Sequence, residues 1–216
     1  MLKKILQQLA PTHTKLIAVS KTHPSERVMA LYNQGQRIFG ENRVQELAAK
    51  YEALPKDIEW HLIGHLQTNK VKYIAQFVTC IQSVDSLKLL EEIDKQASKC
   101  DRVIDCLLQF HIAEEETKFG LDEAEATELL QSPEFQELKN VNIAGVMGMA
   151  TFTDDLVQVR REFRHLKGIF DNLKDRFFQD QPNFKEISMG MSGDYLLAVE
   201  EGSTMVRVGT LLFGGR

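Results

Sequence analysis

The feature of this sequence that most constrains its fold is a series of eight short apolar runs that alternate with helical patterns. Most of the runs are almost continuously apolar, which is typical of parallel strands buried on both faces. The first four runs begin about 20 residues apart, close to the shortest spacing for a strand–helix unit. The expected strands cover residues 16–20, 37–40, 58–63, 78–83, 103–110, 142–149, 184–189 and 205–213.

Start and stop signals bound the helices expected between these strands. The residues that precede a helical pattern, as N-cap residues do, are Ser25, Asp85, Asp122, Asp154 and Ser192. Gly35, Pro55, Pro133 and Gly202 follow or close such patterns. The longest expected helix runs from Asp154 to about Phe178, with an apolar side that includes Phe163 and Phe170. Strands alternating with helices favour a parallel sheet.

Eight such units within 216 residues predict an α/β fold, a single (β/α)₈ barrel of the TIM type. The barrel would occupy residues 1–216 as one domain, since no linker stands out. The alternative is an open, doubly wound sheet. No GxGxxG motif follows the first expected strand, which counts against that alternative.

Composition excludes several classes of partner. The net charge is −5 and the acidic and basic residues interleave, so a nucleic-acid partner is not expected. No apolar run approaches the roughly 18–20 residues of a membrane span, and Gln7 and Gln8 interrupt the N-terminal apolar run, unlike a secretory signal. Three cysteines without a CxxC pair predict neither disulfides nor a zinc site. We expect a cytoplasmic monomer without membrane, nucleic-acid or metal partners.

Polar residues follow the expected strands at the end where barrels carry their chemistry. Lys21 comes directly after the first strand and would project its amine into the barrel mouth. Burial there would lower the pKa of the amine, and a less protonated amine can attack an aldehyde to form a Schiff base. The alternative is a surface lysine in a loop.

Two glycine-containing stretches predict an anion site. SMGMSGD carries Ser188 and Ser192, and VGT carries Gly209 and Thr210. Hydroxyls, backbone N–H groups and a helix start make an anion site, and barrels often hold phosphate at the loops after strands seven and eight. The alternative is ordinary turn glycines with an N-cap serine. Arg207 lies inside the last apolar run, where a buried arginine is costly unless paired, and an edge ion pair is its alternative interpretation.

Taken together, several ordered motifs are similar to those of the pyridoxal phosphate homeostasis protein family, which has the barrel of the alanine racemase N-terminal domain. They are VSKTHP, FGENRVQE, WHLIGHLQTNK, IQSVD and SMGMSGDYLLAVEEGSTMVRVGTLLFGGR, which run from about Val19 to the last residue. The resemblance implies pyridoxal 5′-phosphate (PLP) bound covalently as a Schiff base on Lys21, with Arg207 facing the pyridine nitrogen. It also implies a phosphate cradle formed by Gly209, Thr210, Ser188 and Ser192.

The same resemblance implies further residues around the ring. Asn42 and His61 match residues that line the ring pocket, and Ser83 and Met147 match its wall. LQFHIAEEETKFG is a looser version of the family's segment after strand five, in which His111 replaces a more usual asparagine. Lys118 lies in the same segment, where a solvated loop lysine is the simpler interpretation.

The residues also bear on catalysis. An arginine opposite the ring nitrogen opposes its protonation and weakens carbanion stabilisation, although racemases of this fold also use arginine. Those racemases take a second base, a tyrosine, from a C-terminal β-domain across a dimer. This sequence ends just after the eighth expected strand, so that domain is not expected. The tyrosines fall in expected helices: Tyr32, Tyr51, Tyr73 and Tyr195.

Three functions therefore stay open. The first is a non-catalytic protein that holds PLP on Lys21 and buffers it or delivers it to apo PLP-dependent enzymes. The second is a weak PLP-dependent amino-acid racemase or lyase that uses the same site. The third is a binding module whose cofactor occupancy signals to a protein partner. The missing second base favours the first over the second.

Overall fold

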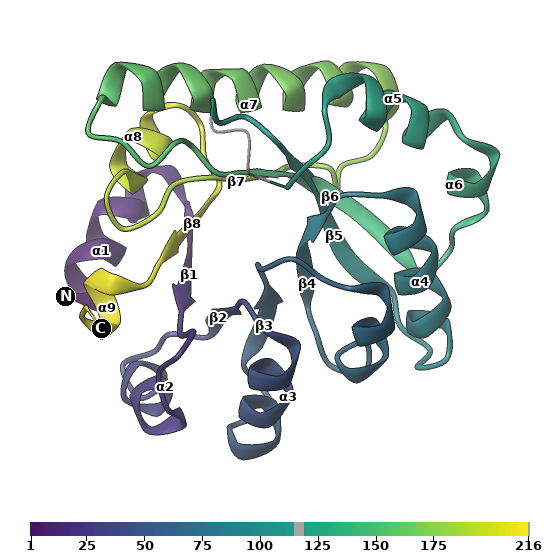
Figure 1. The fold of residues 1–216 in the computed structure, drawn as a ribbon. Coiled ribbons are helices and arrows are strands. Elements are labelled where there is room, and N and C mark those ends of the chain that lie inside the picture. The colour runs from purple at the N-terminus through teal and green to yellow at the C-terminus, as the bar shows by residue number, and fades with distance from the viewer. Residues whose placement is uncertain (115–118, 216) are drawn as a thin grey trace.

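The strands close into a barrel. The computed structural model describes residues 1–114 and 119–215, and its eight parallel strands follow one another in sequence order around the barrel (Figure 1). The last strand pairs with the first, with Lys15 opposite Met205 and Ile17 opposite Arg207. This closure confirms the predicted (β/α)₈ barrel and excludes the open sheet. The strands are β1 (Lys15–Val19), β2 (Ile38–Glu41), β3 (Glu59–Leu62), β4 (Cys80–Val84), β5 (Ile104–Phe110), β6 (Val141–Gly148), β7 (Glu186–Ser188) and β8 (Met205–Val208).

Helices surround the strands in Figure 1, with the long α7 running across one side. Residues such as Val159, Phe163 and Leu166 are buried along α7, as the apolar side of the predicted helix requires. The helices are α1 (Leu2–Leu9), α2 (Ser25–Tyr32), α3 (Val44–Ala53), α4 (Leu87–Ser98), α5 (Glu123–Gln131), α6 (Pro133–Glu137), α7 (Leu156–Phe177), α8 (Tyr195–Glu200) and α9 (Thr210–Phe213), with short 3₁₀ helices η1 (Ala10–Thr12) and η2 (Thr68–Tyr73). No helix in the part of the chain that the structure describes is long and apolar enough to cross a bilayer.

The largest departure from the predicted elements is at the end of the chain. Residues 205–213 read as one strand, but β8 ends at Val208 and α9 follows. The carbonyl of Gly209 accepts the amides of Leu212 and Phe213, both at 2.9 Å, which is a helical pattern. Phe213 is buried against the main core. A short apolar run is compatible with either a strand or a packed helical turn, so the apolar pattern alone does not distinguish the two.

Two helix boundaries also differ from those expected from the sequence. Pro133 not only follows α5 but begins α6, because proline suits a first helical turn. Ser192 was expected to precede the next helix directly, yet α8 begins three residues later. There the Asp194 carboxylate accepts the amide of Met191 at 2.5 Å and closes a turn before the helix. This places Ser192 in a loop above the barrel instead of at a helix cap.

Two apolar regions hold the barrel together. The main core lies between strands and helices and includes the fully buried Phe39 and Trp60, whose rings are 5.9 Å apart. A smaller cluster includes Ile17, Leu107 and Met147. Because the inward-facing residues also include polar groups, the barrel interior is the place to look for a site.

Candidate functional site

A cavity of about 590 Å³ lies where β1, β2, β6, β7 and β8 end. Apolar side chains such as Val19, Ile63, Met149 and Met191 form part of its wall. It is also lined by six of the ten residues predicted from the sequence to bind a cofactor: Lys21, Asn42, Ser192, Arg207, Gly209 and Thr210. An apolar cavity with a few convergent polar groups is typical of a small-molecule site.

Lys21 is the amine at this cavity. It follows β1 in a turn of residues 20–23, which is closed by the His23 amide donating to the Ser20 carbonyl at 3.0 Å. The side chain is exposed, so the burial expected from the sequence is not found: the barrel mouth is open. Within the described residues, no hydrogen bond or ion pair of the Lys21 amine is observed. The amine is therefore available to an incoming ligand.

Arg207 is the buried cation of the cavity, only 4% exposed. One terminal nitrogen donates to the carbonyl and the hydroxyl of Ser188 at 2.8 and 2.7 Å, and the other donates to the Gly148 carbonyl at 2.9 Å. None of these acceptors is a carboxylate, so the edge ion pair considered from the sequence is not what holds it. Burial lowers the pKa of Arg207 to about 10, which still leaves it charged at neutral pH.

The donor chemistry of Arg207 tests whether a cofactor fits. A guanidinium has five N–H groups, and three of them are used by Ser188 and Gly148. The other two N–H groups are left for a ligand, because Arg207 lines the cavity. A heterocyclic nitrogen with a lone pair is the kind of acceptor these donors need. The ring of PLP, which carries such a nitrogen, therefore fits this donor set.

The loops after β7 and β8 are joined at the same cavity. The Ser192 hydroxyl accepts the Gly209 amide at 3.2 Å and so links the two loops. Gly193, next in the chain, faces open space, since a Cβ there would meet nothing within 4 Å. Thr210 is exposed beside them. Hydroxyls and backbone amides around open space, with Lys21 and Arg207 as nearby cations, fit an anionic phosphate.

Asn42 is placed by a close backbone approach. The loop after β3 passes so near that a Cβ on Gly64 would lie 2.3 Å from the Asn42 carbonyl oxygen. Only glycine allows that approach. The buried Ser83, predicted as pocket wall, does not line the cavity; its hydroxyl donates to the Gly64 carbonyl at 2.7 Å. Ser83 thus holds the loop that supports Asn42.

Three of the predicted residues lie below the cavity, inside the barrel. Ser188 accepts from Arg207 and donates to the Gln82 side-chain oxygen at 2.6 Å. The Gln82 amide nitrogen lies 2.8 Å from Nδ1 of His61. Because an amide nitrogen can only donate, Nδ1 of His61 is an acceptor in this arrangement. Met147 is fully buried in the small apolar cluster.

His61 belongs to the other end of the barrel. It lines a second cavity, of about 350 Å³, together with Lys15 and Glu186 near the amino ends of the strands. Burial, with a smaller effect of Lys15, lowers the pKa of His61 to about 3, so the ring is neutral. The structure therefore does not bring His61 together with Lys21. His111 follows β5 and does not line the cavity either, and Lys118 lies outside the described residues.

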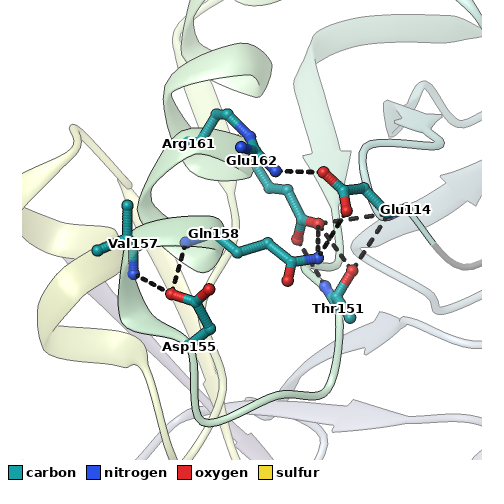
Figure 2. Close-up of polar contacts among 7 residues, drawn as sticks. All are labelled: Glu114, Thr151, Asp155, Val157, Gln158, Arg161 and Glu162. Atoms are coloured by element: carbon teal, nitrogen blue, oxygen red, sulfur yellow. Dashed lines mark hydrogen bonds and ion pairs between the residues drawn. The ribbon is translucent and has the colours of Figure 1, made fainter.

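The sequence analysis did not single out Glu162, which holds a loop at the edge of the cavity. The Glu162 carboxylate of α7 accepts the amide and the hydroxyl of Thr151, both at 2.7 Å, and the Gln158 amide at 3.1 Å (Figure 2). Thr151 lines the cavity, so these contacts fix the loop between β6 and α7 beside it. The available signal was the position of Glu162, a charged residue between the apolar Val159 and Phe163.

Comparisons with known proteins identify relatives of this chain. A family model described as the alanine racemase N-terminal domain matches residues 2–216. A pyridoxal phosphate homeostasis protein of Aquifex aeolicus is 44% identical over 203 residues, which is 94% of this chain and 87% of that protein.

Solved structures are similar as well. PipY of Synechococcus elongatus PCC7942, determined without PLP, has a TM-score of 0.88 and 38% sequence identity and covers 97% of this chain and 100% of its own. PipY with PLP bound has a TM-score of 0.84 at the same identity and coverage.

Proposed function

The chain belongs to the family of pyridoxal phosphate homeostasis proteins, and from this premise we propose that it binds PLP as a Schiff base on Lys21 and buffers or delivers it. The observation that carries the proposal is the exposed Lys21 amine, which faces the same cavity as the buried, partly uncommitted guanidinium of Arg207. The relative PipY has been solved with PLP bound, which supports the choice of ligand.

Each residue of the cavity has a task in this proposal. PLP supplies an aldehyde when bound. Lys21 would hold the aldehyde carbon through its amine as a C=N bond, with the aldehyde oxygen released as water. Because a guanidinium has N–H donors and no acceptor, Arg207 would donate toward the ring nitrogen and would favour its unprotonated form. Ser192, Gly209 and Thr210 hold the phosphate, and Asn42 lies beside the ring.

The residues that line the cavity favour binding of PLP over catalysis with it. No tyrosine, histidine or cysteine is among the described residues that line it, and these are common second bases for racemisation. The exposure of Lys21 lets water reach the C=N bond, so release by hydrolysis is available. A weak amino-acid racemase or lyase is the alternative. A cytoplasmic monomer, one domain over 1–216 and transfer to apo enzymes remain predictions from the sequence.

The direct test of PLP binding is spectroscopic. We expect the protein loaded with PLP to be yellow, and we expect borohydride to fix one cofactor per chain. Peptide mapping should then find it on Lys21. Lys21→Ala should lose the fixed adduct while retaining weaker, reversible binding. An adduct on a different residue, or none in the unaltered protein, would overturn the proposal.

The non-catalytic part needs its own experiment. The loaded protein is incubated with L-alanine and other amino acids in deuterated water, and deuterium at the α-carbon is followed with time. We expect exchange far below ordinary enzymatic turnover. Turnover on the order of 1 s⁻¹ would instead establish the alternative, a PLP-dependent enzyme.

A further inference from the structure

A partly buried charge cluster contacts the turn that carries Lys21. It consists of Glu41 at the end of β2 and Glu46 and Lys50 on α3. The Lys50 ammonium contacts the Glu41 carboxylate at 2.6 Å and the Glu46 carboxylate at 2.9 Å. Glu41 is fully buried and Lys50 nearly so. Neither lines the cavity, and the function proposed above uses none of the three.

This cluster contacts both peptide groups that flank Lys21. The Lys50 ammonium donates to the Ser20 carbonyl at 2.7 Å, which belongs to the peptide before Lys21. The Thr22 amide donates to the Glu46 carboxylate at 2.6 Å, which belongs to the peptide after it. Helix α3 therefore holds the backbone on each side of the amine-bearing residue.

The turn needs such support. Thr22 has a φ of +67°, in the left-handed region where a β-branched residue is disfavoured and glycine or asparagine is usual. A conformation of this kind persists where surrounding contacts impose it. The Thr22 amide bond to Glu46 is such a contact, and the Ser20 hydroxyl adds another by donating to Glu41 at 2.5 Å.

Lys50 is itself unsuited to the role of Lys21. An ammonium has three N–H groups, and the acceptors Ser20, Glu41 and Glu46 account for all of them. Because these three acceptors hold the Lys50 ammonium behind the turn and Lys50 does not line the cavity, it is not placed to meet an aldehyde there. One lysine thus serves as a fixed anchor, while the other remains free to react.

We propose that Glu46 and Lys50 are positioning residues that aim the Lys21 amine into the cavity. The inference rests on the proposed function, because it concerns the orientation of the amine that would bind PLP. Its specific consequence is that the cluster favours ligands with an aldehyde and does little for the same ligand without one.

The test compares PLP with pyridoxamine phosphate, which has the same ring and phosphate but no aldehyde. In Glu46→Ala we expect PLP affinity to fall about tenfold, equivalent to about 1.4 kcal/mol, and pyridoxamine phosphate affinity to stay the same. Glu46→Gln, whose amide oxygen still accepts the Thr22 amide, should recover most of the preference for PLP. Glu52→Ala is the matched control, since Glu52 is exposed on the same helix and its side chain makes no contact with the turn.

The outcomes separate the two proposals. If the unaltered protein binds both ligands equally and borohydride fixes nothing on Lys21, the covalent function itself fails and the positioning role falls with it. If the unaltered protein prefers PLP and Glu46→Ala keeps that preference, only the positioning role is overturned. An equal loss of affinity for both ligands in Glu46→Ala would also overturn the positioning role, because such a loss would indicate a general structural effect.

Discussion

The two ends of the barrel each present a cavity with a lysine, but they treat their polar groups differently. At the amino end, Lys15 forms an ion pair with Glu186 at 2.6 Å, and Asp105 accepts the Asn142 amide at 2.7 Å. At the carboxyl end, no partner of the Lys21 amine is observed within the described residues, and Arg207 retains uncommitted donors.

The comparison teaches that a cavity is not enough to identify a site. The amino-end cavity is smaller, about 350 Å³ against about 590 Å³, yet it is richer in charged side chains. Its Lys15 amine is already committed to Glu186, which stabilises the fold and leaves that amine unavailable to a ligand. Barrels of this type carry function at the carboxyl end and stability at the other, and the pairing of the two lysines follows that division.

The largest effect is expected from replacing each of the two lysines in turn, which tests the difference between the two ends of the barrel. Lys15 begins β1 and Lys21 lies in the turn after its end, so the two lysines flank the same strand at opposite ends of the barrel. We expect Lys21→Ala to abolish the borohydride-fixed PLP adduct with little change in the free energy of unfolding. Lys15→Ala should keep the adduct and lose about 1–2 kcal/mol of stability, because the buried Glu186 is left without its cation.

Adduct formation is measured by mass spectrometry after reduction, and stability by urea unfolding of the apo proteins. Each variant is the control for the other, since both remove one lysine amine next to β1, at its two opposite ends. Loss of the adduct in Lys15→Ala with retention in Lys21→Ala would reverse the assignment of the two ends.

Acid should destabilise the protein through the amino-end half of the barrel. The pKa of His61 is about 3 in the folded state, compared with a usual value of 6.5. As pH falls below about 6.5, the unfolded chain binds the proton first, so stability is lost progressively down to about pH 3. Between about pH 7.5 and about pH 5, the unaltered protein should lose about 2 kcal/mol more than His61→Gln.

The measurement is the free energy of unfolding in urea at the two pH values. Glutamine keeps an acceptor for Gln82 but cannot titrate, so the variant isolates the proton. His165→Gln, which removes an exposed histidine on α7, serves as the control and should keep the steeper loss. Equal acid sensitivity of the unaltered protein and His61→Gln would show that His61 is not the buried neutral group described here.

The barrel could be predicted because its signal is repeated along the whole chain. Each buried strand is short and apolar, and eight of them in order leave few alternatives. The elements that escaped prediction are single helical turns: α9 was read as strand and α6 was not expected. Over four or five residues, a helical period and a strand period give the same apolar pattern, and packing decides between them.

The site was predictable where a residue follows a strand end and less so where it lies within a strand. Lys21, Gly209 and Thr210 lie within two residues after a strand end, and all three line the carboxyl-end cavity. His61 and Met147 lie one residue before the ends of β3 and β6 and point into the barrel at other depths. Depth depends on the tilt and stagger of all the strands together, which no local motif contains.

The smallest effect we expect comes from two threonines that bracket β8. Thr210 follows the strand at the carboxyl end, and Thr204 precedes it at the amino end, where its hydroxyl donates to Glu186 at 2.7 Å. Thr210→Ala should weaken PLP binding by about 0.5–1.5 kcal/mol, the value of one hydroxyl hydrogen bond. Pyridoxal, which lacks the phosphate, should bind that variant as it binds the unaltered protein. Thr204→Ala should leave PLP affinity unchanged, because its hydroxyl is already committed to Glu186. Equilibrium titration of the PLP absorbance measures all three proteins, and equal PLP affinity for Thr210→Ala and the unaltered protein would remove Thr210 from the phosphate site.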